Sequence, residues 1–278
     1  MKKTITLFIL FISVLTYAQK KEKVKGSKIV KLEQKQVDNF ESVEVEDNLE
    51  IFLVKGDECA LEIEADDNLI EFVEYKLTGK NLRISTSRDI SSYKKLSVRV
   101  TYNDKMNMVI AKDETNVTAL SDVVLDDITF KSYDYAKLFL NAKTKNFTLM
   151  ANDKSKIELN LKSDKTAIDL SKSAYVKALI SSPDMRFDVY QKASADVEGD
   201  VINLKLRLDN SSDFNGKKLT AKNATVELAA YSKLSINISN IATIDASGNS
   251  EMDLYGEPKI EIKRFTESAM IKKRPIKN

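Results

Sequence analysis

Apolar and polar residues alternate along short segments of the first hundred residues. In Val43-Glu44-Val45-Glu46 and Leu61-Glu62-Ile63-Glu64 every second side chain is apolar, which is the period of a β-strand with one buried face. The turn signals Lys55-Gly56-Asp57 and Thr78-Gly79-Lys80-Asn81 separate further runs of this kind. We therefore expect residues 38–105 to form an all-β opening with two β-hairpins, which join 49–54 with 60–63 and 72–75 with 82–84.

From about residue 106 the pattern repeats. An apolar anchor residue recurs at spacings of 18 to 20 residues, an alanine or serine follows six positions later, and another apolar residue follows eight positions later. The anchors are Phe130, Leu149, Ile168, Phe187, Leu206, Val226, Ile244 and Ile262. The small residues are Ala136, Ser155, Ala174, Ala193, Ser212, Ser232, Ser250 and Ser268, and the later apolar residues are Leu138, Ile157, Val176, Ala195, Phe214, Leu234, Met252 and Met270.

A unit of this length with two alternating runs is typical of one coil of a β-solenoid. The period is too short for a repeat of two helices, which needs more than about 30 residues. Stacked coils place equivalent residues about 4.8 Å apart, and a narrow corner explains a column of alanine and serine. The sequence therefore predicts an all-β protein: a single-stranded parallel β-helix of about nine coils over residues 106–270, preceded by the all-β opening.

The first 18 residues have the features of a signal peptide. Met1-Lys2-Lys3 is basic, residues 5–15 are apolar, and Thr16-Tyr17-Ala18 places cleavage before Gln19. The apolar run is shorter than the roughly 20 residues of a membrane-spanning helix. We expect an exported mature chain without a transmembrane segment, in the periplasm or at the cell surface.

Charge is balanced overall but unevenly distributed. The chain has 44 Lys+Arg and 42 Asp+Glu, so removal of Lys2 and Lys3 leaves 44 − 2 = 42 basic residues and a formal charge of zero. This balance gives no electrostatic basis for nucleic-acid binding. Lysines concentrate in residues 19–37, which we expect to form a mobile basic linker, and acidic residues concentrate in residues 38–72.

Composition excludes several chemistries. The chain has no histidine, and Cys59 is its single cysteine, so it has no Ser-His-Asp or Cys-His relay, no histidine-ligated zinc, no thiolate metal cluster and no internal disulfide. We therefore predict a protein without a cofactor or a metal site.

The closing and opening segments resemble a known family. Residues 242–260, Ala-Thr-Ile-Asp-Ala-Ser-Gly-Asn-Ser-Glu-Met-Asp-Leu-Tyr-Gly-Glu-Pro-Lys-Ile, resemble the closing signature of the putative auto-transporter adhesin head, or GIN, domain family. The opening agrees through Phe40-x-x-Val43-x-Val45, Gly56, Asn68-Leu69 and Gly79-x-x-Leu82-x-Ile84. The resemblance covers residues 38–274. It implies an exported β-helix domain with an adhesive or envelope role and supplies no catalytic residues. The chain departs from the family at the coil corners, where only Gly248 keeps the usual glycine.

Two sets of outward residues are candidates for a site. Asp169, Asp188 and Arg207 each follow an anchor by one position, so two carboxylates lie on neighbouring coils, near the roughly 5 Å separation of retaining glycosidases. The same residues also fit an ordinary ladder of mixed charge. The second set is aromatic, and it either forms a contact strip for glycan or protein or is scattered over the surface: Tyr133 and Tyr190, three positions after their anchors, and Tyr135 and Tyr231, five positions after theirs.

These patterns favour an exported, non-catalytic β-helix protein of the cell envelope that binds surface glycan or protein along the rod. The alternatives are an envelope structural or stress-related component and a polysaccharide-active enzyme. We also expect Lys272-Lys273-Arg274 to shield the strand edges of the last coil, followed by a short tail at residues 275–278.

Overall fold

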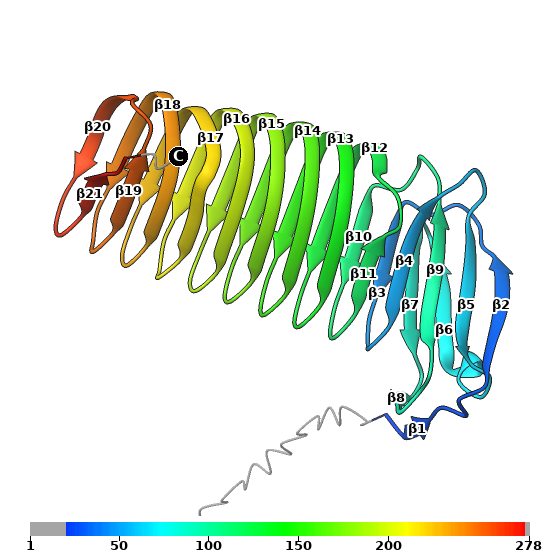
Figure 1. The fold of residues 1–278 in the computed structure, drawn as a ribbon. Helices are drawn as coiled ribbons and strands as arrows, with labels where there is room; N and C mark the ends of the chain where they lie inside the picture. The colour runs from blue at the N-terminus through cyan, green and yellow to red at the C-terminus, as the bar shows by residue number, and fades with distance from the viewer. Residues whose placement is uncertain (1–20, 276–278) are drawn as a thin grey trace, which may run out of the picture.

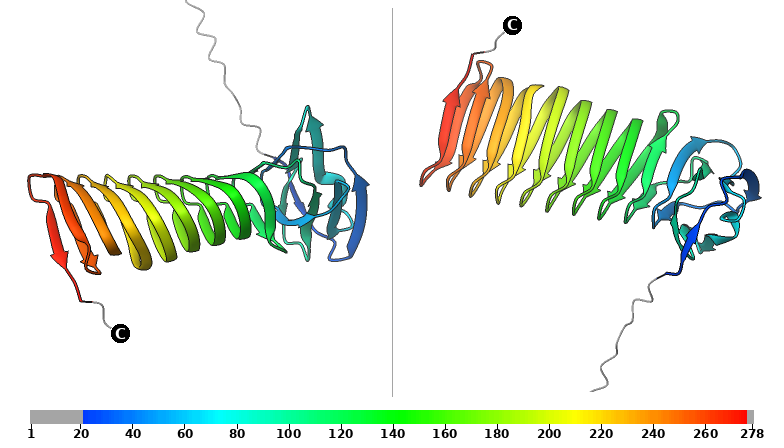
Figure 2. Two further views of the ribbon diagram at one scale, coloured as in Figure 1. Left: turned by 90° about the horizontal axis from the view of Figure 1, so that it is seen from above. Right: turned by 60° about the horizontal axis from the view of Figure 1, so that its bottom comes forward.

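The protein is a straight β-solenoid rod with a differently folded N-terminal end (Figures 1 and 2). The computed structural model describes residues 21–275, so the predicted signal peptide lies outside the described residues. Its strands are arranged as the all-β prediction requires, in about nine turns with a period of about 19 residues. No helix within residues 21–275 is long and apolar enough to span a membrane.

Each coil of the rod has two faces. Face A carries the anchors, face B carries the apolar residues eight positions later, a tight corner leads from face A to face B, and a wide corner leads from face B to the next face A. A strand from β13 to β18 therefore starts on face B, bends at the wide corner and ends on face A. The rod strands are β10 (Met108–Ala111), β11 (Asn116–Ala119), β12 (Val123–Ser132), β13 (Lys137–Ala151), β14 (Lys156–Leu170), β15 (Tyr175–Val189), β16 (Ser194–Leu208), β17 (Asp213–Leu228), β18 (Lys233–Ala246), β19 (Glu251–Tyr255), β20 (Lys259–Phe265) and β21 (Met270–Lys273).

The predicted register is confirmed along the rod. Parallel pairing aligns each anchor on face A with the next, from Phe130 to Ile262. On face B it aligns Leu138 through to Met252 in the same way. Because like residues stack on like, the interior is a set of apolar ladders, in which Phe187 and Phe214 also meet edge to face with their ring centroids 5.0 Å apart.

The tight corner explains the column of small residues, and most of its left-handed positions are occupied by residues other than glycine. The column residues Ala136 to Ser250 are at most 1% exposed, since the chain turns inward there and leaves no room for a longer side chain. Two positions earlier, the backbone is left-handed in every coil, with φ of 60° at Asp153, 59° at Lys172 and 61° at Gln191. Asp153 suits this position because its Oδ2 accepts the backbone N–H of Asp134 in the neighbouring coil, at 3.4 Å.

The N-terminal end does not follow the order of the chain. The coil of β3 (Ser42–Val45) and β4 (Glu50–Lys55) lies between the β10–β11 coil and a further coil made of β7 (Asn81–Thr86) and β9 (Leu96–Tyr102). Of the two expected hairpins, β6 (Val73–Thr78) with β7 is confirmed. The other is wrong, because β9 lies between β4 and β5 (Ala60–Asp66) and pairs with both.

Antiparallel strands close this end of both faces. β6 pairs beyond β7 on face A, whereas β5 and then β2 (Val30–Gln36) extend face B beyond β9. A short 3₁₀ turn, Ile70–Phe72, leads into β6. The expectation of a mobile linker over residues 19–37 is therefore wrong for the described part, because β2 and β1 (Lys23–Lys25) both pair, the latter with β8 (Asp89–Ser91).

One buried carboxylate holds the leader against this end. Asp66 is 0% exposed. Its two oxygens accept the backbone N–H groups of Lys28 at 2.8 Å and of Lys94 and Lys95 at 3.0 Å. Burial acts to raise the pKa of Asp66, but these N–H donors outweigh it and hold the pKa below its ordinary value.

The last coil is out of register by one residue. A bulge at Lys263 lets Arg264 pair with Asp245 and lets Ile271 pair with Met252. The positions assigned from spacing to Ser268 and Met270 are therefore wrong by one residue, since Ser268 and Met270 are exposed while Ala269 packs against the core.

Candidate functional site

The carboxylate pair lies on face A, next to the tight corner. Asp169 and Asp188 are direct neighbours in register on β14 and β15, and Arg207 follows Asp188 on β16, as the spacing predicts. The guanidinium of Arg186 lies between the two carboxylates. Its Nη1 and Nη2 each donate to one oxygen of Asp169 at 2.8 Å, and Nη1 also donates to Asp188.

Arg186 forms ion pairs with both of the carboxylates that a glycosidase would need for catalysis. Asp188 is 8% exposed, and burial raises the pKa of its carboxyl above the ordinary value, because lost hydration outweighs the charge of Arg186. The sequence analysis missed Arg186. Its signal was the spacing of two residues from Asp188 on one strand, which places both side chains on the same outward face.

Arg207 belongs to a separate set of contacts. Its guanidinium lies 5.6 Å from the ring centroid of Tyr190, and its Nε lies 3.8 Å from Glu227 Oε2. Asp188 and Arg207 are paired in register, and Arg207 contacts Tyr190, so these three candidates lie together. Their contacts are those of a ladder of mixed charge, the non-catalytic interpretation of the same residues.

The other tyrosines do not extend this cluster into a continuous strip. Tyr133 and Tyr190 share a column but lie three coils apart, about 14 Å by strand spacing, with Asn152 and Ser171 between them joined by a 2.8 Å hydrogen bond. Tyr135 and Tyr231 are 54% and 65% exposed and lie five coils apart, about 24 Å. Lys154 covers the first of these rings, with Nζ 5.0 Å from the centroid.

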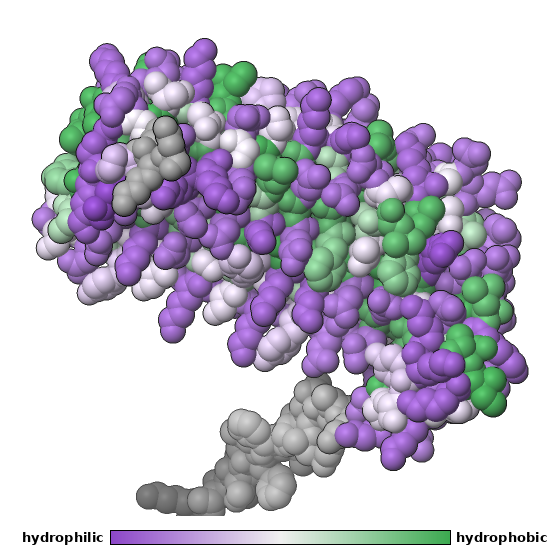
Figure 3. Space-filling model, in the orientation of Figure 1, coloured by the Kyte–Doolittle hydropathy of each residue, from purple (hydrophilic) through white to green (hydrophobic). Residues whose placement is uncertain are grey.

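A groove at the wide corner is the larger feature of the rod surface. Two adjoining hollows of about 820 and 540 Å³ share Ser181 and Pro183. Their lining residues lie on seven successive strands, which span about 29 Å at the spacing of paired strands. They include Val124, Lys143, Lys162, Ser181, Asp200 and Thr220, which are paired in register, and Ser239 on β18. Hydrophilic side chains cover most of the rod side that Figure 3 shows.

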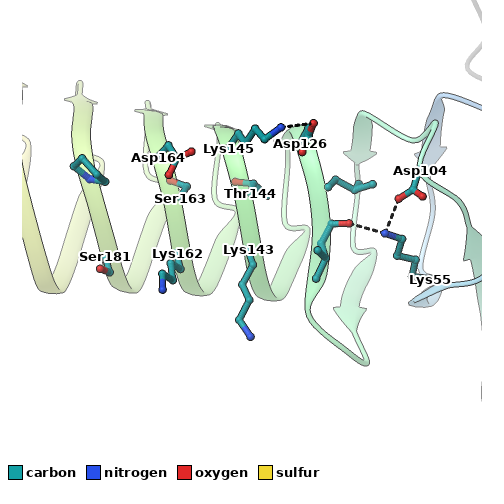
Figure 4. Close-up of a pocket in the computed structure, with 13 residues that line it drawn as sticks. Lys55, Asp104, Asp126, Lys143, Thr144, Lys145, Lys162, Ser163, Asp164 and Ser181 are labelled. Carbon is teal, nitrogen blue, oxygen red and sulfur yellow. Dashed lines mark hydrogen bonds and ion pairs between the residues drawn. The ribbon is translucent and has the colours of Figure 1, made fainter.

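Small residues make the floor of this groove. Thr144 and Ser163 occupy successive coils between two rims, with Lys143 and Lys162 on one rim and Lys145 and Asp164 on the other (Figure 4). The column continues with Ser182, Val201 and Ala221. The sequence analysis missed this second column of short side chains, although its spacing of 14 to 15 residues after each anchor could have shown it.

Hydroxyls, paired charges and apolar side chains together line the groove. Beneath the floor, Ser163 Oγ and the buried Thr166 Oγ1 lie 2.6 Å apart, and Thr166 Oγ1 lies 3.0 Å from Ser182 Oγ. On the rims, Lys145 pairs with Asp126 at 2.8 Å and Lys143 with Asp122 at 2.7 Å. Within residues 21–275, no group of three or more acidic, histidine or cysteine side chains is arranged to hold a metal ion.

Stacked coils with a long surface groove define the protein as a β-solenoid. Residues 39–258 match the family model described as putative auto-transporter adhesin, head GIN domain, and the chain belongs to that family. No curated protein matches the chain at a significant level.

Several solved structures share the fold. A putative adhesin from Parabacteroides distasonis superposes with a TM-score of 0.65 at 14% identity, covering 90% of this chain and 99% of its own. A putative adhesin from Parabacteroides merdae gives 0.61 at 14% identity, covering 91% and 100%. A putative lipid binding protein from Parabacteroides distasonis gives 0.64 at 13% identity, with the same coverage. At these identities the likeness concerns the fold alone.

Proposed function

We propose that this protein is an exported, non-catalytic adhesion module of the cell envelope that binds an extended surface glycan along the wide-corner groove. Membership in an adhesin-head family supports adhesion and a location at the cell surface. The single observation that carries the choice of ligand is the groove, which extends past seven strand levels and has serine or threonine on its floor at Thr144, Ser163 and Ser182.

The groove suits a glycan better than a peptide. A peptide that binds by main-chain pairing needs a free sheet edge, but along the groove each strand from β13 to β17 pairs with a neighbour on both sides. A hydroxyl-rich chain instead exchanges hydrogen bonds with Ser181, Asp200 and Lys162 while it lies along the rod. The open shape leaves one side of such a chain in water, which fits reversible attachment.

The enzymatic alternative is disfavoured by Arg186. General acid and base roles require two carboxylates in different protonation states with access to the substrate, whereas Asp169 is held by two bonds to the guanidinium. We expect no release of reducing sugar from envelope polysaccharide. If release does occur and Asp169→Asn abolishes it, the protein is an enzyme.

A pair of matched variants tests the groove. Ser181 donates to Asp200 Oδ2 at 3.1 Å inside the groove, so Ser181→Arg places a long side chain across it. Ser173→Arg makes the same change at the exposed tight corner. With purified surface polysaccharide immobilised on a sensor, Ser181→Arg should weaken binding by about tenfold, which corresponds to about 1.4 kcal/mol, and Ser173→Arg should bind normally.

The tyrosine strip predicted from sequence is the alternative binding surface, and substitution of its tyrosines tests it. We expect the double variant Tyr135→Ala/Tyr231→Ala to retain binding in the same assay. If it loses binding while Ser181→Arg retains it, the glycan lies along the tight corner with Tyr133, Tyr190 and Arg207. Failure of all forms, including the unmodified protein, to bind any polysaccharide fraction or to adhere to cells would refute the glycan-binding proposal.

A further inference from the structure

The C-terminal end of the rod leaves core positions open to water. On β20, Ile260 is 45% exposed, Ile262 is 54% exposed and Phe265 is 46% exposed. Their partners one coil earlier, Ala242, Ile244 and Ala246, are at most 1% exposed. Apolar residues are visible at this end of the rod in Figure 3. The last coil therefore has an apolar inner side with nothing stacked upon it among the described residues.

The backbone at this end is also unpaired on one side. Within residues 21–275, β20 pairs with β18 and β21 pairs with β19, and neither has a partner on its outer edge. Unpaired N–H and C=O groups along a strand are a template for another strand. They also disfavour insertion into a lipid bilayer, where each unsatisfied group costs several kcal/mol.

Charged side chains protect the outer edge of β21 from pairing with another strand, but they do not protect β20. On β21, Lys273 occupies an inward position above Leu254, and its ammonium is tied to Glu257 Oε1 at 2.6 Å. An inward-pointing charge of this kind shields an edge strand. On β20 the inward residues are apolar, so pairing is expected to centre on β20.

The sequence of β20 is complementary to itself. It begins Lys259-Ile260-Glu261-Ile262-Lys263, and when two copies run antiparallel about a two-fold axis at Ile260 or Ile262, each Glu261 faces a lysine of the second copy. Lys259 already contacts Glu261 of its own strand at 2.9 Å, so pairing exchanges an exposed contact for one across the interface. The two-fold axis also places the apolar residues of both copies against each other.

We propose that the C-terminal end is a homotypic interface, through which two copies join tail to tail with β20 paired antiparallel to β20 of the second copy. This goes beyond the glycan-binding proposal and does not depend on it. The dimer is a rod of twice the length, with both N-terminal ends outward. A seven-residue strand spans about 23 Å and the two faces are about 10 Å apart, so the end of the rod offers about 230 Å². This area is small compared with the roughly 800 Å² per partner of a standard interface. We therefore expect reversible association.

Sedimentation equilibrium of the purified mature chain, combined with small-angle X-ray scattering, tests the proposal. The mass should rise from monomer to dimer between about 1 µM and several hundred µM, and the maximum dimension should roughly double. Glu261→Lys makes the edge uniformly basic and should weaken dimerisation by at least tenfold. The charge-swapped triple variant Lys259→Glu/Glu261→Lys/Lys263→Glu restores the alternation and should dimerise like the unmodified protein.

The charge swap separates a specific interface from general charge effects. A variant at the opposite end, Glu33→Lys on β2, should leave the association unchanged. The proposal is overturned by a monomer at all these concentrations, by a dimer no longer than the monomer, by growth beyond a dimer, or by a triple variant as weak as Glu261→Lys.

Discussion

The two ends of the rod solve the same problem in different ways. Both end a stack of parallel strands, and a stack leaves strand edges and core residues without partners. At the N-terminal end, β6 covers face A while β5 and β2 extend face B, and Phe40 and Tyr102 are only 1% exposed. The outer edges of β6, β2 and β20 all lack a partner among the described residues, so the ends differ in the core: at the C-terminal end Ile262 is half exposed.

The difference teaches that a repeat specifies how coils stack but not how the stack ends. The closed end is made entirely by residues outside the repeat, and one of its coils, β3 with β4, is inserted out of chain order. The open end is simply one more coil. Its charged residues make ion pairs with the coil below, such as Arg264 with Asp245 at 2.7 Å, and they do not cover the core.

The largest expected effect comes from truncating one phenylalanine at each end. Phe40→Ala removes a buried ring and should lower the free energy of unfolding by about 3–5 kcal/mol. Phe265→Ala removes a ring that is 46% exposed and should cost about 1 kcal/mol or less. Urea denaturation at low protein concentration, where the chain is monomeric, measures both. Equal losses for the two variants would show that the C-terminal end is packed as tightly as the N-terminal end.

A smaller difference in stability is expected between two positions of the alanine and serine column, one in the middle of the rod and one in the last coil. Ala174 is 0% exposed in the tight corner, so Ala174→Val should cost about 1–3 kcal/mol through overpacking. Ser268, displaced by the bulge into solvent, should accept valine within about 0.5 kcal/mol. Ala174→Ser is the control, because Ser155 occupies the equivalent position in the preceding coil. A tolerated Ala174→Val would mean that the corner is wider than its alanine and serine content indicates.

The rod could be predicted from sequence because its contacts repeat. Once Phe130 and Leu149 are recognised as equivalent, every coil adds the same evidence for the register, and the columns of both faces follow. The N-terminal end offered no such redundancy. Turn signals identified the strand segments, but they could not show that β9 lies between β4 and β5, because these pairings join residues 31 to 47 positions apart.

The candidate site was predicted less completely, for a related reason. Spacing placed Asp169 beside Asp188 correctly, because both lie one position after an anchor. Arg186 lies one position before its anchor, so a comparison of residues within one column does not include it. The groove was missed because its floor is defined by short side chains on several coils, none of which carries a chemical signal alone.

The smallest effect that distinguishes the ends is the pH dependence of the closed end. The pKa of Asp66 is lowered, because the N–H groups of Lys28, Lys95 and Lys94 outweigh the opposing effect of burial, and the charge of Lys28 acts in the same direction. A carboxyl with a lowered pKa contributes stability above its unfolded pKa of about 3.9, and it loses that contribution as the pH falls through the folded pKa. The closed end should therefore loosen first in acid, below about pH 4.

Asp66→Asn should remove this part of the acid dependence and lower stability at pH 7. Hydrogen exchange measured between pH 3 and 6, corrected for the intrinsic rate, follows β2 and β9 separately from the rod. Asp188→Asn is the matched control, since burial raises the pKa of Asp188. A carboxyl with a raised pKa contributes less to folding stability as the pH rises, which is the opposite dependence to that of Asp66. If β2 and β9 stay protected at pH 3 while β14 and β15 open, the hydrogen bonds of Asp66 do not hold the N-terminal end closed.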